Sequence, residues 1–207
     1  MLSLLKRFTR KDDAAVAFEA VIMTPILAFM FVASFVFFDA FRTYNTSVKA
    51  TYAVADVISR QGEADVYESD IRGLANIFQH ITRNPNGSAI RVTQLIYDAD
   101  TDDYSFEGSF ATNGRTELRA SDIPDLRDRI PVMSDGDAVL IVESWIPYRP
   151  AFDVGLGALE FSNFTTTRPR VGRIPFNDGD DPACVSCNWG ETPDLGDGDT
   201  TGSPTNS

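Results

Sequence analysis

The sequence has few of the residues on which most enzymes and metal sites depend. It contains one histidine and two cysteines among 207 residues, and 30 acidic side chains outnumber 18 basic ones. The lone His80 offers no acid–base triad, and a zinc site needs several ligands of this kind. The segment GLGAL at 155–159 lacks the third glycine of a dinucleotide fingerprint, and no P-loop is present. We therefore expect no catalytic activity, cofactor or metal, and the net charge of −12 argues against nucleic acid as a partner.

One acidic segment has a spacing that is reminiscent of a calcium loop. Asp98, Asp100 and Asp102 match the first positions of an EF-hand. The next position, which must be glycine in that loop, is Asp103, and the last is Ser109 in place of glutamate. The segment is therefore predicted to be the solvated tip of a hairpin.

What the sequence does have is a long apolar run at residues 20–38, interrupted only by Thr24 and Ser34. Its 19 residues approach the roughly 20 that cross a bilayer as a helix. A core helix of a soluble protein is the alternative, but such helices seldom lack a polar face over this length. The run predicts a single transmembrane helix.

The charges that flank the run predict its orientation. Four closely spaced basic residues precede it: Lys6, Arg7, Arg10 and Lys11. By the positive-inside rule, the N-terminus lies in the cytoplasm and the rest of the chain is periplasmic. A cleaved secretory signal is the main alternative, but signal h-regions are about 7–15 residues long and no small-residue cleavage site follows Phe38. We expect the run to remain in the inner membrane.

A carboxylate, Glu19, lies inside the apolar segment that starts at Ala15. A charged side chain in hydrocarbon is costly, so an intramembrane glutamate indicates a function. The alternative is that Glu19 lies near the cytoplasmic interface and reaches water without a partner. Pro25, within the same segment, is predicted to kink the helix.

Helical periodicity continues beyond the apolar run, since neither glycine nor proline occurs between Pro25 and Gly62. One helix from about Ala15 to Arg60 would be roughly 70 Å long at 1.5 Å per residue. Its second half carries an apolar stripe at Phe41, Tyr44, Val48, Tyr52, Ala55 and Ile58.

The remainder predicts one helix and four strands. The helix covers residues 65–82, and its apolar face consists of Ile71, Leu74, Ile77, Phe78 and Ile81. The strands are predicted at 89–98, 104–112, 137–148 and 158–168. The fold class is therefore α+β, with a long N-terminal helix followed by a small exported domain that has one helix and an antiparallel sheet.

These patterns divide the chain into four parts: a basic cytoplasmic leader at 1–14, the transmembrane and projecting helix at 15–61, the exported domain at 62–176, and an acidic tail at 177–207. The tail is rich in Gly, Asp and Pro and contains Cys184 and Cys187. In an oxidising compartment these two form a small structural disulfide. Free or intermolecular thiols and a metal or redox site remain as alternatives.

Several segments together resemble a known family. The segment AAVAFEAVIMTPIL after a basic leader, with Glu19 six residues before Pro25, resembles the start of TadE-like proteins. These are minor pseudopilins of the tight adherence (Tad, Flp or type IVc) pilus. ADVISRQ, IPVMSDGDAVLIVESWIPYRPAF and FTTTRPR resemble the later segments of the family in character and order. The resemblance covers residues 5–175.

The resemblance implies a function in pilus assembly or initiation for surface adhesion. A prepilin peptidase would cut between Ala14 and Ala15, although the family usually has glycine before the cut, so an unprocessed anchor remains open. Glu19 would pair with the new N-terminal amine of an adjacent subunit and set the register of the helices. The implied partners are the peptidase, the inner-membrane assembly platform, a sister pseudopilin and the major pilin, with the protein either at the base of the fibre or within it.

Two functions of other classes remain as alternatives. The chain could be a bitopic sensor or adhesion protein with a ligand-binding periplasmic domain, or a secreted binding domain from which the whole apolar run is removed. Pilus-assembly genes beside this one would favour the pseudopilin, whereas an isolated genomic position would favour the bitopic protein.

Overall fold

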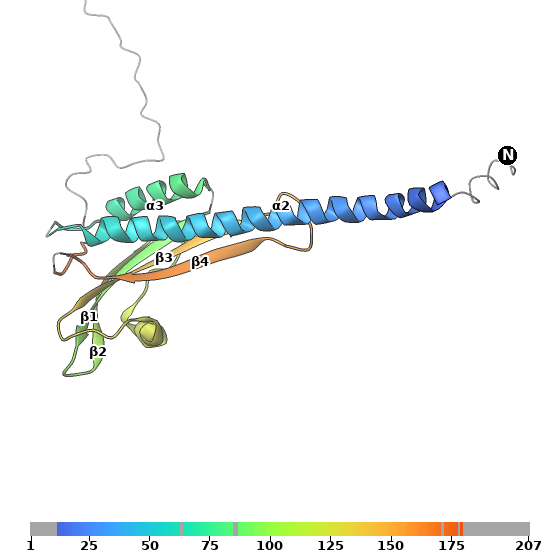
Figure 1. The fold of residues 1–207 in the computed structure, drawn as a ribbon. Helices are drawn as coiled ribbons and strands as arrows, with labels where there is room; N and C mark the ends of the chain where they lie inside the picture. The colour runs from blue at the N-terminus through green and yellow to red at the C-terminus, as the bar shows by residue number, and fades with distance from the viewer. Residues whose placement is uncertain (1–11, 63, 85–86, 171, 178, 180–207) are drawn as a thin grey trace, which may run out of the picture.

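The protein, described here by a computed structural model, has an α+β fold in which a long helix extends far beyond a small sheet (Figure 1). The structure describes residues 12–62, 64–84, 87–170, 172–177 and 179. In chain order the elements are α2 (Asp12–Ser59), α3 (Glu68–Thr82), β1 (Ala89–Asp98), β2 (Asp103–Ala111), the 3-10 helix η1 (Ala120–Arg129), β3 (Ala138–Tyr148) and β4 (Leu159–Thr167). The long helix, the second helix and the four strands predicted from the sequence are confirmed, each strand to within a residue at either end.

The four strands form one antiparallel sheet in the order β2-β1-β3-β4. The central strands are buried on both faces because successive side chains of a strand point to opposite sides. On one face Leu140 and Val142 of β3 pack against α2 and α3. On the other, Val139 and Ile141 pack against Ile123 of η1. This two-sided burial explains why β3 is an almost continuous apolar run.

The second half of α2 lies along β4 and runs in the same direction. The Tyr44 ring lies 5.7 Å from that of Phe161, near the start of β4. At the other end of α2, the amide of Arg170, just beyond β4, donates to the carbonyl of Ser59 at 2.8 Å. The second half of α2 and β4 are therefore parallel. The first half of the helix projects beyond the sheet (Figure 1).

The face of α2 that packs on the sheet differs from the predicted stripe. Ala55 and Ile58 are buried as expected, but Phe41, Tyr44 and Tyr52 are exposed, so the prediction was wrong for these three. The buried positions are instead mostly small: Ser47, Ala50, Thr51, Val54, Ala55 and Ile58. Small side chains let the helix backbone approach the sheet closely, whereas aromatic rings would hold it away.

The second helix, α3, also buries a narrower face than predicted. Ile71, Leu74, Ala75 and Phe78 are buried, whereas Ile77 and Ile81 are exposed, which corrects the expected face. The helix begins at Glu68, three residues later than predicted. The preceding Val66 is held instead in a parallel bridge with Phe176. His80 is exposed in the last turn of the helix.

Two packed segments were absent from the sequence prediction. The 3-10 helix η1 covers the face of the sheet opposite α2, with Ile123 buried. On the α2 side, Ile174 is fully buried and Phe176 stacks on Phe110. A Cβ at Gly108 would lie 2.7 Å from the Cβ of Phe176, so only glycine permits this contact.

Candidate functional site: the apolar helix and its junction with the sheet

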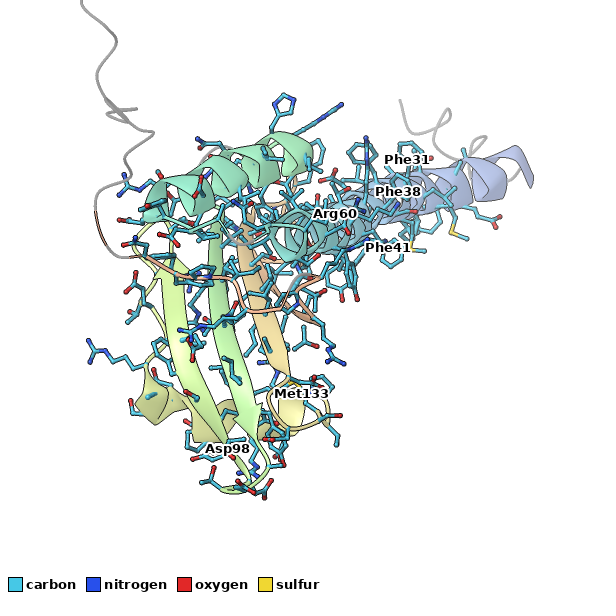
Figure 2. The ribbon with its side chains drawn as sticks, turned by 90° about the vertical axis from the view of Figure 1, so that its left-hand side faces the viewer. Phe31, Phe38, Phe41, Arg60, Asp98 and Met133 are labelled. Atoms are coloured by element: carbon cyan, nitrogen blue, oxygen red, sulfur yellow. The ribbon has the colours of Figure 1, made fainter. Side chains whose placement is uncertain are left out.

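The first half of α2 is apolar and almost bare. Its most apolar 18-residue window has a mean hydropathy of 2.4 and is 6% buried. Large exposed side chains cover it on all sides, among them Phe18, Val21, Ile26, Leu27, Phe29, Met30, Phe31 and Phe35. Phe31 and Phe38 project from the helix beyond the sheet in Figure 2. Apolar surface of this extent is stable only when lipid or another protein covers it.

Four residues that were proposed for special roles lie in continuous helix within this half: Ala14, Ala15, Glu19 and Pro25. Glu19 is exposed and, among the described residues, forms no hydrogen bond or ion pair. Ala15 lies one helical turn before Glu19, and Ala14 directly precedes Ala15. Both alanines belong to the first part of α2. A chain that began at Ala15 would therefore place its amine one turn from a carboxylate of the same helix. The helix continues through Pro25, and the predicted kink remains a prediction.

The apolar half is fixed to the sheet at its last turn by Tyr148, the final residue of β3. The Tyr148 hydroxyl lies 3.1 Å from Oδ2 of Asp39 and 3.3 Å from the carbonyl oxygen of Val36. Burial, followed by the hydrogen bond to Asp39, raises the pKa of the Tyr148 phenol above its usual value. Val36 itself is only 1% exposed. The sheet domain therefore reaches down to the end of the apolar run.

A polar seam continues this junction further along α2. The hydroxyl oxygens of Thr51 and Ser144 lie 2.7 Å apart, in the buried interface between α2 and β3. The Asn163 amide of β4 donates to Ser47 at 3.0 Å and to Ser144 at 3.1 Å. These partners satisfy polar groups that would be costly to bury alone. The seam therefore fixes the helix on the sheet in one register.

Ion pairs complete the attachment at the C-terminal end of α2. Asp56 accepts from Arg60, one turn on, at 2.8 Å and from Arg170, beyond β4, at 3.2 Å. The hydrogen bond from Arg60 is the main cause that lowers the pKa of Asp56 below its usual value. Both ion pairs are exposed, so their contribution to the free energy of unfolding is small.

The carboxylates of the β1–β2 hairpin are engaged in local contacts. Asp102 pairs with Arg127 at 2.7 Å and accepts the Tyr97 hydroxyl at 2.8 Å. Asp98 accepts the amide of Asp100 in a turn, which lowers its pKa. No group of three or more metal-ligating side chains occurs in the described part of the chain. Asp98 marks the hairpin tip, at the end of the strands that points away from α2 (Figure 2).

The sequence thus located the long apolar helix, but it missed the residues that join this helix to the sheet. Tyr148, Ser144 and Asn163 lie about 90 or more positions from their partners on α2. No local pattern marks such pairs. Cys184 and Cys187 lie outside the described residues.

Comparison with known protein families, with curated proteins and with solved structures finds no match to this chain.

Proposed function

We propose that this protein is a non-catalytic minor pseudopilin of the TadE-like kind, which acts in the assembly or initiation of a Tad pilus. One observation carries the proposal: a single helix is bare and apolar in its first half and is built into the core of a small domain in its second half. Such a helix serves as a membrane anchor before assembly and as a packing element between subunits after it.

Burial within the structure favours an anchor over the alternatives. A core helix of a soluble protein is mostly buried, whereas the apolar window here is 6% buried. A signal sequence would be cut off after the apolar run. The contacts of Tyr148 with Val36 and Asp39 argue against this, because the domain packs on residues at and before any such cut. The basic leader favours a cytoplasmic N-terminus and a periplasmic domain.

Glu19 is proposed to set the register between neighbouring subunits. Its carboxylate has no partner among the described residues of its own chain, and an unpaired charge in hydrocarbon is costly. A prepilin peptidase that cuts after Ala14 would create an ammonium group at Ala15. Pairing that group with Glu19 of an adjacent subunit neutralises both charges and holds the two helices in one alignment. The assembly platform, a sister pseudopilin and the major pilin are the partners this requires.

Substitution of Glu19 tests the proposal. Glu19→Leu should still insert into the membrane, and more favourably, but should abolish piliation because the register is lost. Glu19→Gln keeps a hydrogen-bonding group without the charge and should be intermediate. The readout is a blot of shed pilin beside a blot of the membrane fraction.

A matched control removes a carboxylate elsewhere. Glu117→Leu changes an exposed residue of the sheet domain, outside the helices and strands, and should leave piliation unchanged. Wild-type piliation in both Glu19 variants, with normal amounts of protein in the membrane, would contradict the proposed register and leave Glu19 as a side chain that only reaches interfacial water.

A further inference from the structure

A polar pocket lies between α2 and the C-terminal end of α3, immediately above the apolar half of α2. Its volume is about 440 Å³. Its walls are Asp39, Arg42, Thr43 and Thr46 of α2 together with Ile81, Thr82 and Arg83 at the end of α3. In Figure 1, α3 lies alongside α2 and its C-terminal end points toward the projecting half of the long helix. The pocket therefore opens at the side of the domain from which the anchor emerges.

This inference rests on the proposed function, in which the apolar half of α2 is a membrane anchor. In that case the pocket lies at the level of the lipid headgroups along the membrane normal. Arg42 follows the last residue of the apolar run, Phe38, by four positions, or about 6 Å of helix. The polar layer on each side of the hydrocarbon is about 5–7 Å thick. The lining residues of α2 thus lie where phospholipid phosphate groups lie.

The two arginines in the pocket wall differ from most arginines of the domain. Arg42 and Arg83 form no ion pair or side-chain hydrogen bond with any described residue, whereas eight others are each paired with a carboxylate. Guanidinium groups bind phosphate oxygens by charge-assisted hydrogen bonds. The pocket thus presents two unpaired phosphate-binding groups from two different helices.

The remaining polar groups select the kind of phosphate compound. Asp39 uses Oδ2 to accept from Tyr148, which leaves Oδ1 as an acceptor. Thr46 and Thr82 donate to helix carbonyls, so their oxygens also remain acceptors. A carboxylate repels a purely anionic headgroup but attracts an ammonium group. The pocket is therefore complementary to a zwitterion with a phosphate and a primary amine.

We propose that this pocket binds the headgroup of a phospholipid of the phosphatidylethanolamine type. The phosphate lies between Arg42 and Arg83, and the ammonium donates to Asp39. The exposed apolar side chains of Ile81 and Phe38 border the same level and contact the upper part of the acyl chains. One bound lipid would join the end of α3 to the membrane surface and so fix the tilt of the domain over the bilayer.

Lipid retention by the full chain tests the proposal. The protein is extracted from nanodiscs that contain equal amounts of phosphatidylethanolamine, phosphatidylcholine and phosphatidylglycerol, and retained lipid is identified by native mass spectrometry. We expect one phosphatidylethanolamine per chain. Arg42→Gln and Arg83→Gln should each reduce its retention at least about tenfold, the effect of losing one charge-assisted hydrogen bond.

Two further variants separate the site from general charge effects. Arg72→Gln removes the same charge from α3 but at a residue outside the pocket, paired with Glu68, and should retain lipid as the wild type does. Asp39→Asn should remove the preference for phosphatidylethanolamine over phosphatidylglycerol. Thermal unfolding of each variant confirms that it is folded.

Three results would overturn the proposal: equal retention in Arg42→Gln and Arg72→Gln, equal retention of all three lipids by the wild type, or displacement of the lipid by millimolar inorganic phosphate. The last would identify a site for free phosphate. A chain that incorporates into nanodiscs but retains no lipid refutes only this site, whereas a chain that never incorporates refutes the proposed membrane anchor.

Discussion

The two halves of α2 have the same backbone conformation and opposite surroundings. Residues 17–35 are exposed or nearly so, and their large apolar side chains lie on all sides of the helix. In the second half, Ala50, Val54 and Ile58 lie one turn apart and are buried against the sheet and α3. Apolarity alone does not explain this difference, because the bare half is the more apolar of the two.

Side-chain size explains it better. A helix can lie close to a sheet only where its facing residues are small, as Ser47, Ala50 and Thr51 are. A helix with large apolar side chains on every side offers no such face, but it suits a fluid solvent such as lipid, which adapts to any shape. The change from one kind of surface to the other occurs between Val36 and Ser47, where Tyr148 and Phe161 close the junction.

The largest expected difference between the halves is in the stability cost of truncating one large side chain to alanine. Ile58→Ala leaves a cavity in the core and should lower the free energy of unfolding by about 2–5 kcal/mol. Phe31→Ala removes a side chain that is 76% exposed and should change it by less than about 0.5 kcal/mol. Thermal unfolding of the detergent-solubilised full chain measures both. Equal losses would show that the two halves do not differ in the way described.

A smaller effect is expected at the junction. Tyr148→Phe removes the hydrogen bonds to Asp39 and Val36 and should cost about 1 kcal/mol, with faster amide hydrogen exchange near residues 36–40. Because the folded protein raises the pKa of Tyr148, this contribution is present below the unfolded value of about 10 and is lost as the pH rises through the folded value. Unchanged exchange in this variant would remove Tyr148 as the link between the halves.

The smallest effect is expected at the exposed end of α2. The lowered pKa of Asp56 means that its ion pairs stabilise the fold above the unfolded value of about 3.9 and lose this effect as the pH falls through the folded value. Arg170→Gln should therefore lower the melting temperature slightly at pH 7 and leave it unchanged near pH 2. The same small loss at both pH values would show that Arg170 stabilises by packing alone.

The features that the sequence predicted correctly are those determined by residues within one continuous segment. The strand at 89–98 was predicted to the residue, because β-branched residues and bounding turns lie within the segment itself. The long apolar helix was found for the same reason: length and apolarity are properties of one continuous segment.

Features set by distant residues were missed or misplaced. Phe41 and Tyr52 have the spacing of a core stripe, but the residues of α2 that are buried against the sheet are the smaller, mostly non-aromatic ones beside them. The seam of Thr51, Ser144 and Asn163 joins three segments far apart in the chain. The pocket residues Arg42 and Arg83 meet only because α3 folds back along α2.

The intact mass of the protein extracted from membranes decides whether the apolar half of α2 is a permanent membrane anchor, since it reports which part of α2 the mature chain keeps. We predict that the protein fractionates with the inner membrane and that every species retains residues 15–38. A chain that begins at Ala15 is expected after prepilin processing, and a full-length chain in its absence. A main species that begins beyond Phe38 and is recovered in the soluble fraction would show that the apolar half of α2 is a cleaved signal and not a membrane anchor.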